Sequence, residues 1–435
     1  MEKTNKKFWL ALIIFSLCGQ IAWTIENMLF NVFIQEEFNA TLNDIALMVS
    51  LSAVVATITT LLVGALSDKL GKRKIFICFG YLAWGLSILA FAMLKVETIH
   101  NIFYPKTSSY FMAASLGIGL TILFDCVMTF FGSSANDSCF NAWITDVSNN
   151  QNRGKIEGIN SAMPLIAVLV VFGSNMLIEK NENHWTILFI AIGLIVLIVG
   201  ISGFFLIKEV NLPKSNESYF KNIFYGFKIK TFKDNKMLYI LFIGFAIFCT
   251  SVQVFMPYLI IYFTSTLKLE NYVLIFAPAI VVAAAFTFFF GRIIDKIGFV
   301  KSALITLMIY GLGLLLLTLF SNIVLVFIGT MLMMSGYLAL TATFNAEIRN
   351  YTPKEKVGFF QGIRIVMQVL IPMLIGPWIG SILSGTGSEG FLGITGDGYT
   401  PARWIFLGAL VVAVFITIFI YLFRRGKRNE VRLED

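Results

Sequence analysis

Charged residues are scarce in this sequence. Of its 435 residues, 13% are charged and 57% are hydrophobic. Soluble globular proteins carry about 25% charged residues and roughly 45–50% apolar ones. Too few charges are therefore present to cover a water-facing surface of this size. The composition excludes a soluble enzyme, a nucleic-acid-binding protein and a disordered chain.

Histidine and cysteine are also rare. The two histidines, His100 and His184, both lie between the apolar runs described below, which excludes a histidine proton relay inside a membrane. The five cysteines all lie within apolar runs, so they indicate no disulfide framework. The sequence contains no nucleotide-binding loop, metal-ligand cluster or nucleophile–base pair. We therefore expect neither an enzyme nor a bound cofactor or metal.

Long apolar runs are what the sequence has in abundance. A bilayer core about 30 Å thick is crossed by a helix of roughly 20 mainly apolar residues. Twelve runs reach this length, near residues 8–34, 45–66, 75–94, 118–143, 156–179, 186–207, 237–263, 272–292, 302–320, 323–346, 357–382 and 404–423. We predict an all-α polytopic membrane protein with twelve transmembrane helices. Two six-helix bundles, 1–207 and 237–435, would flank a polar central loop, 208–236.

The basic residues are sorted to one side of this predicted topology. Of the 33 lysines and arginines, 27 fall on one side of the membrane, 5 on the other, and Arg364 falls inside a helix. Cytoplasmic loops carry such an excess of basic residues. We therefore predict a protein of the cell (plasma) membrane with both termini in the cytoplasm. The net charge of +8 reflects this orientation and not a nucleic-acid partner.

The two halves are copies of one unit. GALSDKLG, from Gly64, returns as GRIIDKIG 227 residues later, and FNAWI, from Phe140, returns as FNAEI 204 residues later. The two offsets differ by 23 residues, which predicts extra chain around 95–118 between the third and fourth helices. Duplicated halves that rock against each other are typical of secondary transporters.

The loop after the second run carries a motif with separable physical roles. Gly71 permits a tight turn, and Lys72, Arg73 and Lys74 hold the loop at the cytoplasmic face. Here the sequence resembles the major facilitator superfamily, whose signature at this loop is matched at Gly64, Leu66, Asp68, Lys69, Gly71, Lys72 and Arg73. The second copy keeps Gly291, Asp295, Lys296 and Gly298 but lacks the basic pair. The resemblance implies a conformational latch formed by Gly64, Asp68, Gly71, Arg73 and Asp295.

A second pattern lies at the end of the fourth run. Asn136-Asp137 and the segment Asn141 to Asp146, followed by Arg153, resemble the sugar–cation symporters of the glycoside–pentoside–hexuronide and sucrose types. The resemblance implies that Asp137 is the functional acid of helix four. Sodium-coupled members carry a pair of acids in helix two, and the run 45–66 has none. This departure from the sodium-coupled pattern favours a proton-coupled or an uncoupled cycle over coupling to sodium.

Four ionisable residues fall inside predicted spans. A charge near the bilayer centre costs at least ~2.5–3.5 kcal/mol, so Glu26, Asp125, Asp137 and Arg364 are functional candidates. Asp137 and Arg364 lie at nearly the same predicted depth in opposite halves, and we hypothesise that they face one cavity as opposite charges. Asp125 ranks below the others because the sequence leaves the start of helix four, and so the depth of this residue, open.

Uncharged polar residues and one aromatic complete the candidate solute site. Carboxylates and amides can bind sugar hydroxyls, and Trp23 lies one turn from Glu26. We therefore predict that substrate and coupling ion are handled by Asp137, Glu26, Arg364, Asn27, Asn141, Asn345, Gln253, Gln361 and Trp23.

Three functions remain open at this stage. The first is proton-coupled uptake of a small polar solute, such as a sugar or glycoside, by a monomer in the lipid bilayer that works by alternating access. The second is a drug/proton antiporter for apolar or cationic compounds, although the fifth run lacks the Gly/Pro signature of such pumps. The third is a non-transporting sensor or scaffold, for which long soluble extensions would be expected.

Overall fold

The computed structural model describes residues 6–148, 152–178, 181, 183–209, 227–269, 271–353, 357–387 and 396–434. The chain divides into two compact units, Met1–Tyr219 and Phe220–Asp435, and each is described by itself. Twelve helical segments of the described residues are long and apolar enough to cross a membrane. Each of the twelve overlaps one of the predicted runs. The prediction of an all-α protein with twelve spans is confirmed.

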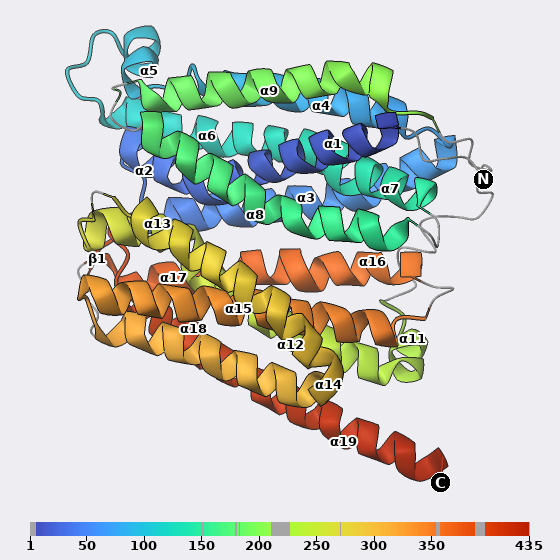
Figure 1. Ribbon diagram of the computed structural model, residues 1–435. Helices are drawn as coiled ribbons and strands as arrows, with labels where there is room; N and C mark the ends of the chain where they lie inside the picture. Colours follow the sequence, from blue (N-terminus) through green and yellow to red (C-terminus); the bar gives the residue numbers. More distant parts are fainter. Residues whose placement is uncertain are drawn as a thin grey trace. The chain divides into compact units, whose positions relative to one another are not determined.

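The first unit contains six of these spans (Figure 1). Two of them include π-helical turns. Its elements are α1 (Lys6–Thr24), η1 (Ile25–Leu29), α2 (Phe30–Phe38), α3 (Leu42–Leu70), α4 (Lys74–Phe91), α5 (Val96–Phe103), α6 (Phe111–Gly132), η2 (Ser133–Phe140), α7 (Asn141–Val147), α8 (Arg153–Ile178) and α9 (His184–Leu206). The first span is α1, η1 and α2 together, and the fourth is α6, η2 and α7 together.

The second unit contains the other six spans. Its helices are α11 (Ile229–Asp234), α12 (Lys236–Phe255), η4 (Met256–Tyr258), α13 (Leu259–Ile261), η5 (Tyr262–Thr266), α14 (Val273–Leu319), α15 (Ile323–Tyr351), α16 (Val357–Ile365), η7 (Val366–Leu370), α17 (Ile371–Ser384), α18 (Trp404–Val414) and α19 (Ile416–Glu434). Two short strands, β1 (Thr386–Gly387) and β2 (Gly396–Asp397), pair antiparallel. Helices α14 and α15 lie side by side (Figure 1).

The apolar surface of the helices explains the low charge of the sequence. Large side chains such as Leu86, Met93 and Phe205 are exposed by 60% or more. Contiguous apolar surface of this kind is unfavourable in water, whereas a lipid phase accommodates it. Close helix contacts depend on small residues, as where Gly85 of α4 meets Gly193 of α9. A Cβ at Gly85 would lie 2.9 Å from the Gly193 carbonyl oxygen.

The extra chain between the third and fourth helices lies where the repeat offsets predict it. It contains α5 and the loop that follows, before α6 begins at Phe111. The predicted start near residue 118 is therefore seven residues late, and Asp125 lies deeper in the span than the sequence suggested. Residues 210–226 of the predicted central loop, 208–236, lie outside the described residues. The described part of this loop includes α11 and the first residue of α12.

Both copies of the loop motif place a glycine with positive φ at the corner, although ψ differs, 27° at Gly71 and 167° at Gly298. A capping box of Thr41 and Asp44 begins α3, and Gly71 ends it with φ 63°. The corresponding Gly298 interrupts α14 with φ 77° and ψ 167°. Residues with a Cβ are strained at positive φ, so both copies need glycine at this corner.

We expect Gly298→Ala to destabilise the protein by about 1–3 kcal/mol, because its backbone conformation is accessible almost only to glycine. A Cβ at Gly298 would meet nothing within 4 Å, so the cost would come from the backbone alone. Thermal unfolding in detergent would measure it. Gly291→Ala is the matched control, since Gly291 is helical and equally open. Equal melting temperatures for the two variants would contradict the prediction.

Candidate functional site

Two π-helical turns in the first unit carry two of the predicted acids. Glu26 lies in η1 and Asp137 lies in η2. The regular i→i−4 ladder is replaced there by a wider turn, and such turns occur frequently at functional sites. The two segments belong to spans one and four, which both contribute to the cluster described next.

The Asp137 carboxylate accepts three hydrogen bonds within the first unit. Trp23 Nε1 donates to Oδ1 at 3.1 Å, and Asn136 Nδ2 donates to the same oxygen at 3.1 Å. Ser133 Oγ donates to Oδ2 at 3.3 Å. The structure thus brings together Trp23 and Asp137, which the sequence separates by 114 residues. The carboxylate is half-buried.

Glycines and a tyrosine hold this arrangement in place. A Cβ at Gly19 would lie 2.4 Å from Asn136 Oδ1, so span one approaches span four only because the residue is glycine. A Cβ at Gly132 would lie 2.7 Å from the Trp84 ring and 3.1 Å from the Trp23 ring. Tyr81 Oη donates to Asn136 Oδ1 at 2.9 Å. Asn136 is thereby fixed on one side by Tyr81 while its amide nitrogen points at Asp137.

Glu26 lies in a second, more deeply buried cluster. Its side chain is 7% exposed, and Oε1 accepts hydrogen bonds from Ser52 Oγ at 2.8 Å and Thr129 Oγ1 at 2.9 Å. These hydroxyls also lie 2.8 Å from each other. Asp125, 2% exposed, acts electrostatically on Glu26, and the Ser52 hydroxyl contacts its carboxyl too. Ser52 and Thr129 were not predicted, and Asp125 was ranked below the other candidate acids.

The remaining predicted residues of the first unit make local contacts. Asn27 Nδ2 donates to the Trp23 carbonyl oxygen at 2.7 Å, and Asn141 Nδ2 donates to the Asp137 carbonyl oxygen at 3.2 Å. Both asparagines are exposed. One N–H of each amide thus bonds its own helix, four residues back, and this hydrogen bond of Asn141 goes to the Asp137 backbone and not to its carboxylate.

In the second unit, the Arg364 guanidinium donates hydrogen bonds to side chains of two spans. Its Nη2 donates to Asn345 Oδ1 at 3.1 Å, and its Nε donates to Gln368 Oε1 at 3.2 Å. Arg364 and Asn345 were both predicted, and the π-helical η7 begins two residues after Arg364. Gln253 is half-buried where α12 and α17 cross, and a Cβ at Gly376 would lie 2.5 Å from its Cβ.

Some predictions lie outside what the structure describes. The side chains of Arg153, Asp295 and Gln361 are outside the described residues, although their backbones lie in α8, α14 and α16. Asp137 and Arg364 belong to different units. Their shared cavity therefore stays a prediction.

Two residues of the predicted latch, Asp68 and Arg73, belong to an ion-pair network centred on Arg73. Arg73 pairs with Asp68, and its Nε donates to Asp146 Oδ2 at 3.1 Å. Its Nη1 donates to Ser67 Oγ at 2.5 Å, and its backbone N–H donates to Glu209 Oε1 at 2.7 Å. Arg73 is 5% exposed. It is thus not a surface anchor like Lys72; it joins the α3–α4 corner to the ends of spans four and six.

The charge balance of this network favours the guanidinium cation. Burial alone lowers the pKa of Arg73, but the neighbouring carboxylates of Asp68 and Asp146 outweigh it, so the pKa lies above its ordinary value. One buried cation here is shared by two carboxylates, and the geometry is held by several charge-assisted hydrogen bonds.

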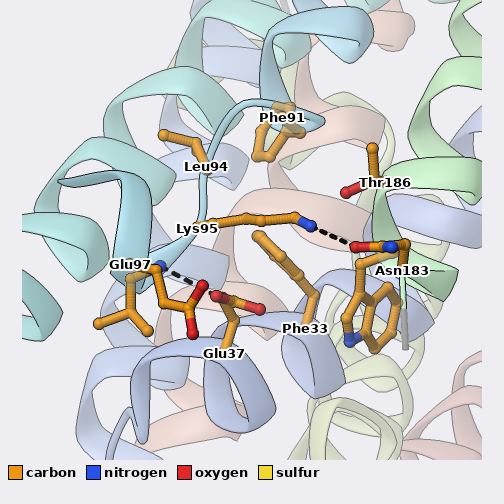
Figure 2. Close-up of a pocket in the computed structure, with 10 residues that line it drawn as sticks. Phe33, Glu37, Phe91, Leu94, Lys95, Glu97, Asn183 and Thr186 are labelled. Carbon is orange, nitrogen blue, oxygen red and sulfur yellow. Dashed lines mark hydrogen bonds between the residues drawn. The ribbon is translucent and has the colours of Figure 1, made fainter. Parts of the chain in front are cut away.

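A cavity of about 290 Å³ lies at the end of the first unit that carries α5 (Figure 2). Lys95 Nζ donates across it to Asn183 Oδ1 at 2.6 Å, and the Val96 N–H donates to Glu37 Oε1 at 2.9 Å. Phe33 and Phe91 line its apolar side. None of the predicted site residues lines this cavity, so it is separate from the Asp137 and Glu26 clusters.

Twelve apolar helical spans, with carboxylates and an arginine inside them, define a multi-pass membrane protein. The family model of the Major Facilitator Superfamily matches residues 12–298 and 242–434. The chain belongs to this superfamily and is a transporter rather than an enzyme, embedded in a membrane and acting on a small-molecule substrate.

Solved structures share the fold at low sequence identity. A bacterial homolog of the human lysosomal transporter Spinster, inward-facing and unoccupied, has a TM-score of 0.70 at 14% identity, with 97% of this chain and 98% of that chain covered. The nucleoside transporter NupG, in a mutant form, gives 0.68 at 14%, covering 97% and 99%. The xylose transporter XylE from E. coli gives 0.63 at 12%, covering 95% and 99%. No curated protein matches the chain.

Proposed function

We propose that this transporter carries out proton-coupled uptake of a small polar solute, such as a sugar or glycoside, by alternating access. The protein would be a monomer in the plasma membrane, and both of its termini would lie in the cytoplasm. The sorting of basic residues supports this orientation. Two of the similar structures are named as a nucleoside transporter and a xylose transporter, which is in keeping with a polar solute.

The observation that carries the proposal is the contact between Trp23 and Asp137. It places an indole ring beside a half-buried carboxylate, on two spans that both contain π-helical turns. A site that pairs an apolar aromatic face with a few fixed polar groups suits a solute with both CH faces and hydroxyl groups. The Arg364, Asn345 and Gln368 cluster of the second unit supplies further hydrogen-bonding groups.

One observation favours a second candidate, export of a lipophilic cation. The charged groups that act on Glu26 are Asp125 and Asp137, so the first unit concentrates three carboxylates in its interior. A cationic substrate would compensate such charges directly. In the uptake model the same charges are compensated by protons.

Proteoliposomes separate these candidates. The purified chain is reconstituted with a pH-sensitive dye inside, and a panel of sugars and glycosides is added outside. We expect at least one of them to drive protons inward, and a protonophore to remove the signal. If no panel member moves protons while expression confers resistance to lipophilic cations, the uptake proposal is wrong and the export candidate replaces it.

A further inference from the structure

The buried cluster around Glu26 contains two carboxyl groups joined by one hydroxyl. Ser52 Oγ, from span two, lies 2.8 Å from Glu26 Oε1 of span one and also contacts the carboxyl of Asp125 from span four. Both carboxyl groups are more than nine-tenths buried. Three spans of the first unit thus meet at one polar point inside apolar surroundings.

The atoms left without partners at this point are acceptors. Glu26 Oε2 and Asp125 Oδ1 are buried and have no hydrogen-bond partner among the described residues. A buried acceptor without a donor loses its hydration and gains nothing in return. What the cluster lacks is therefore positive charge or a hydrogen, and not a further acceptor.

A count of hydrogens leads to the same conclusion. Ser52, Thr129 and Glu26 Oε1 form a triangle with sides of 2.8, 2.8 and 2.9 Å, which are hydrogen-bond lengths for O–H···O. The two hydroxyls own one hydrogen each, and two hydrogens cannot serve all three contacts of the triangle. A proton on a carboxyl group supplies a further donor.

The groups that act electrostatically on this pair add negative charge and include no compensating cation. Asp137 is the other charged group that acts on Glu26, and Cys126 lies beside both carboxyls. Span two carries ionisable side chains only near its ends, at Asp44, Asp68 and Lys69. On α4, the Tyr81 hydroxyl donates to Asn136 Oδ1 and not to the carboxyl pair. Two adjacent buried charges of one sign are strongly unfavourable.

We propose that Glu26 and Asp125 form a carboxyl–carboxylate pair that holds one proton, bridged by the Ser52 hydroxyl. This proton site is distinct from Asp137, whose carboxylate already accepts three hydrogen bonds from Trp23, Asn136 and Ser133. Binding the proton forms one carboxyl O–H bond, and releasing it leaves one more negative charge on the pair. That this proton takes part in the coupled proton movement, together with the Asp137 carboxylate, rests on the proposed function.

Infrared spectroscopy of the purified full-length chain tests the proton pair without any solute. We expect a carboxylic-acid C=O band that persists at neutral pH, where exposed carboxyl groups are ionised, and that shifts in D₂O. Glu26→Gln and Asp125→Asn should each abolish it. Asp137→Asn and the exposed Glu97→Gln should retain it. Ser52→Ala should shift the band without removing it, because the bridge and not the proton site is lost.

Two results would overturn the proposal. One is a neutral-pH band that survives in both Glu26→Gln and Asp125→Asn. The other is a band that disappears from the wild-type protein on addition of sodium alone, since the pair would then be a metal site. Size-exclusion profiles identify variants that fail to fold, and either single variant suffices for the assignment. A wild-type protein that moves no solute would defeat the proposed function, while the infrared result would still decide on the pair.

Discussion

Replacing Asp137 by asparagine should abolish solute-driven proton movement. The substitution keeps the shape of the side chain and one acceptor oxygen, so Trp23 can still donate to it, but the negative charge is lost. We expect the coupled flux in proteoliposomes to fall by about 10²-fold or more, as is common when a proton-transferring group is removed. Melting temperature should change little, because the carboxylate is only half-buried.

The control for this variant is Asn141→Ala. Asn141 lies four residues further along the same span and bonds a backbone carbonyl, not the carboxylate. It was predicted as a solute contact, so a reduced affinity for solute with intact coupling would fit that prediction. Unchanged coupled transport by the Asp137→Asn protein would remove this carboxylate from the mechanism.

Replacing Arg73 by alanine should have the largest effect on stability. The change leaves the carboxylates of Asp68 and Asp146 facing each other without their shared cation. Removing one partner of a buried ion pair costs about 3–5 kcal/mol, and the partial exposure of Asp68 places the expected loss at the lower end of that range. Thermal unfolding in detergent measures it. Transport should also fall, since the network joins the α3–α4 corner to the ends of spans four and six.

Two further variants sharpen this prediction. Arg73→Lys keeps the charge but cannot reproduce the forked contacts to Asp146 and Ser67, so we expect only partial recovery. Lys72→Ala removes the adjacent, exposed lysine and should leave the melting temperature as it is. An Arg73→Ala protein as stable as Lys72→Ala would show that the network contributes nothing to the folded state.

The difference between Arg73 and its neighbours shows what the sequence could not reveal. Lys72, Arg73 and Lys74 are three consecutive basic residues in a loop, and hydropathy treats them alike. Only the fold brings Asp146 and Glu209, 73 and 136 residues away, to the middle one. The spans themselves were predictable because a helix that crosses the lipid bilayer needs an apolar stretch of nearly fixed length.

The residues of the candidate site also fall into those that the sequence predicts and those that only the fold reveals. Glu26, Asp137 and Arg364 could be predicted because an ionisable residue in an apolar run is conspicuous. Ser52 and Thr129 could not, because hydroxyl side chains are frequent in membrane helices and satisfy themselves on their own backbone. Asp125 was ranked low because the start of its helix was uncertain, and the observed start at Phe111 moves it well into the span.

The π-helical turn Ile25–Leu29 has a consequence for the geometry of the whole first span. A π turn accommodates about one residue more than an α turn, so everything beyond it is rotated by roughly 100° relative to an uninterrupted helix. Trp23 before the turn and Phe33 after it therefore do not follow one 3.6-residue periodicity. Deleting a single residue within the turn would restore that periodicity and swing one half of the span away from its present neighbours. The length of this helix, counted to the residue, thus sets which side chains face Asp137 and which face the Phe91 and Phe189 rings.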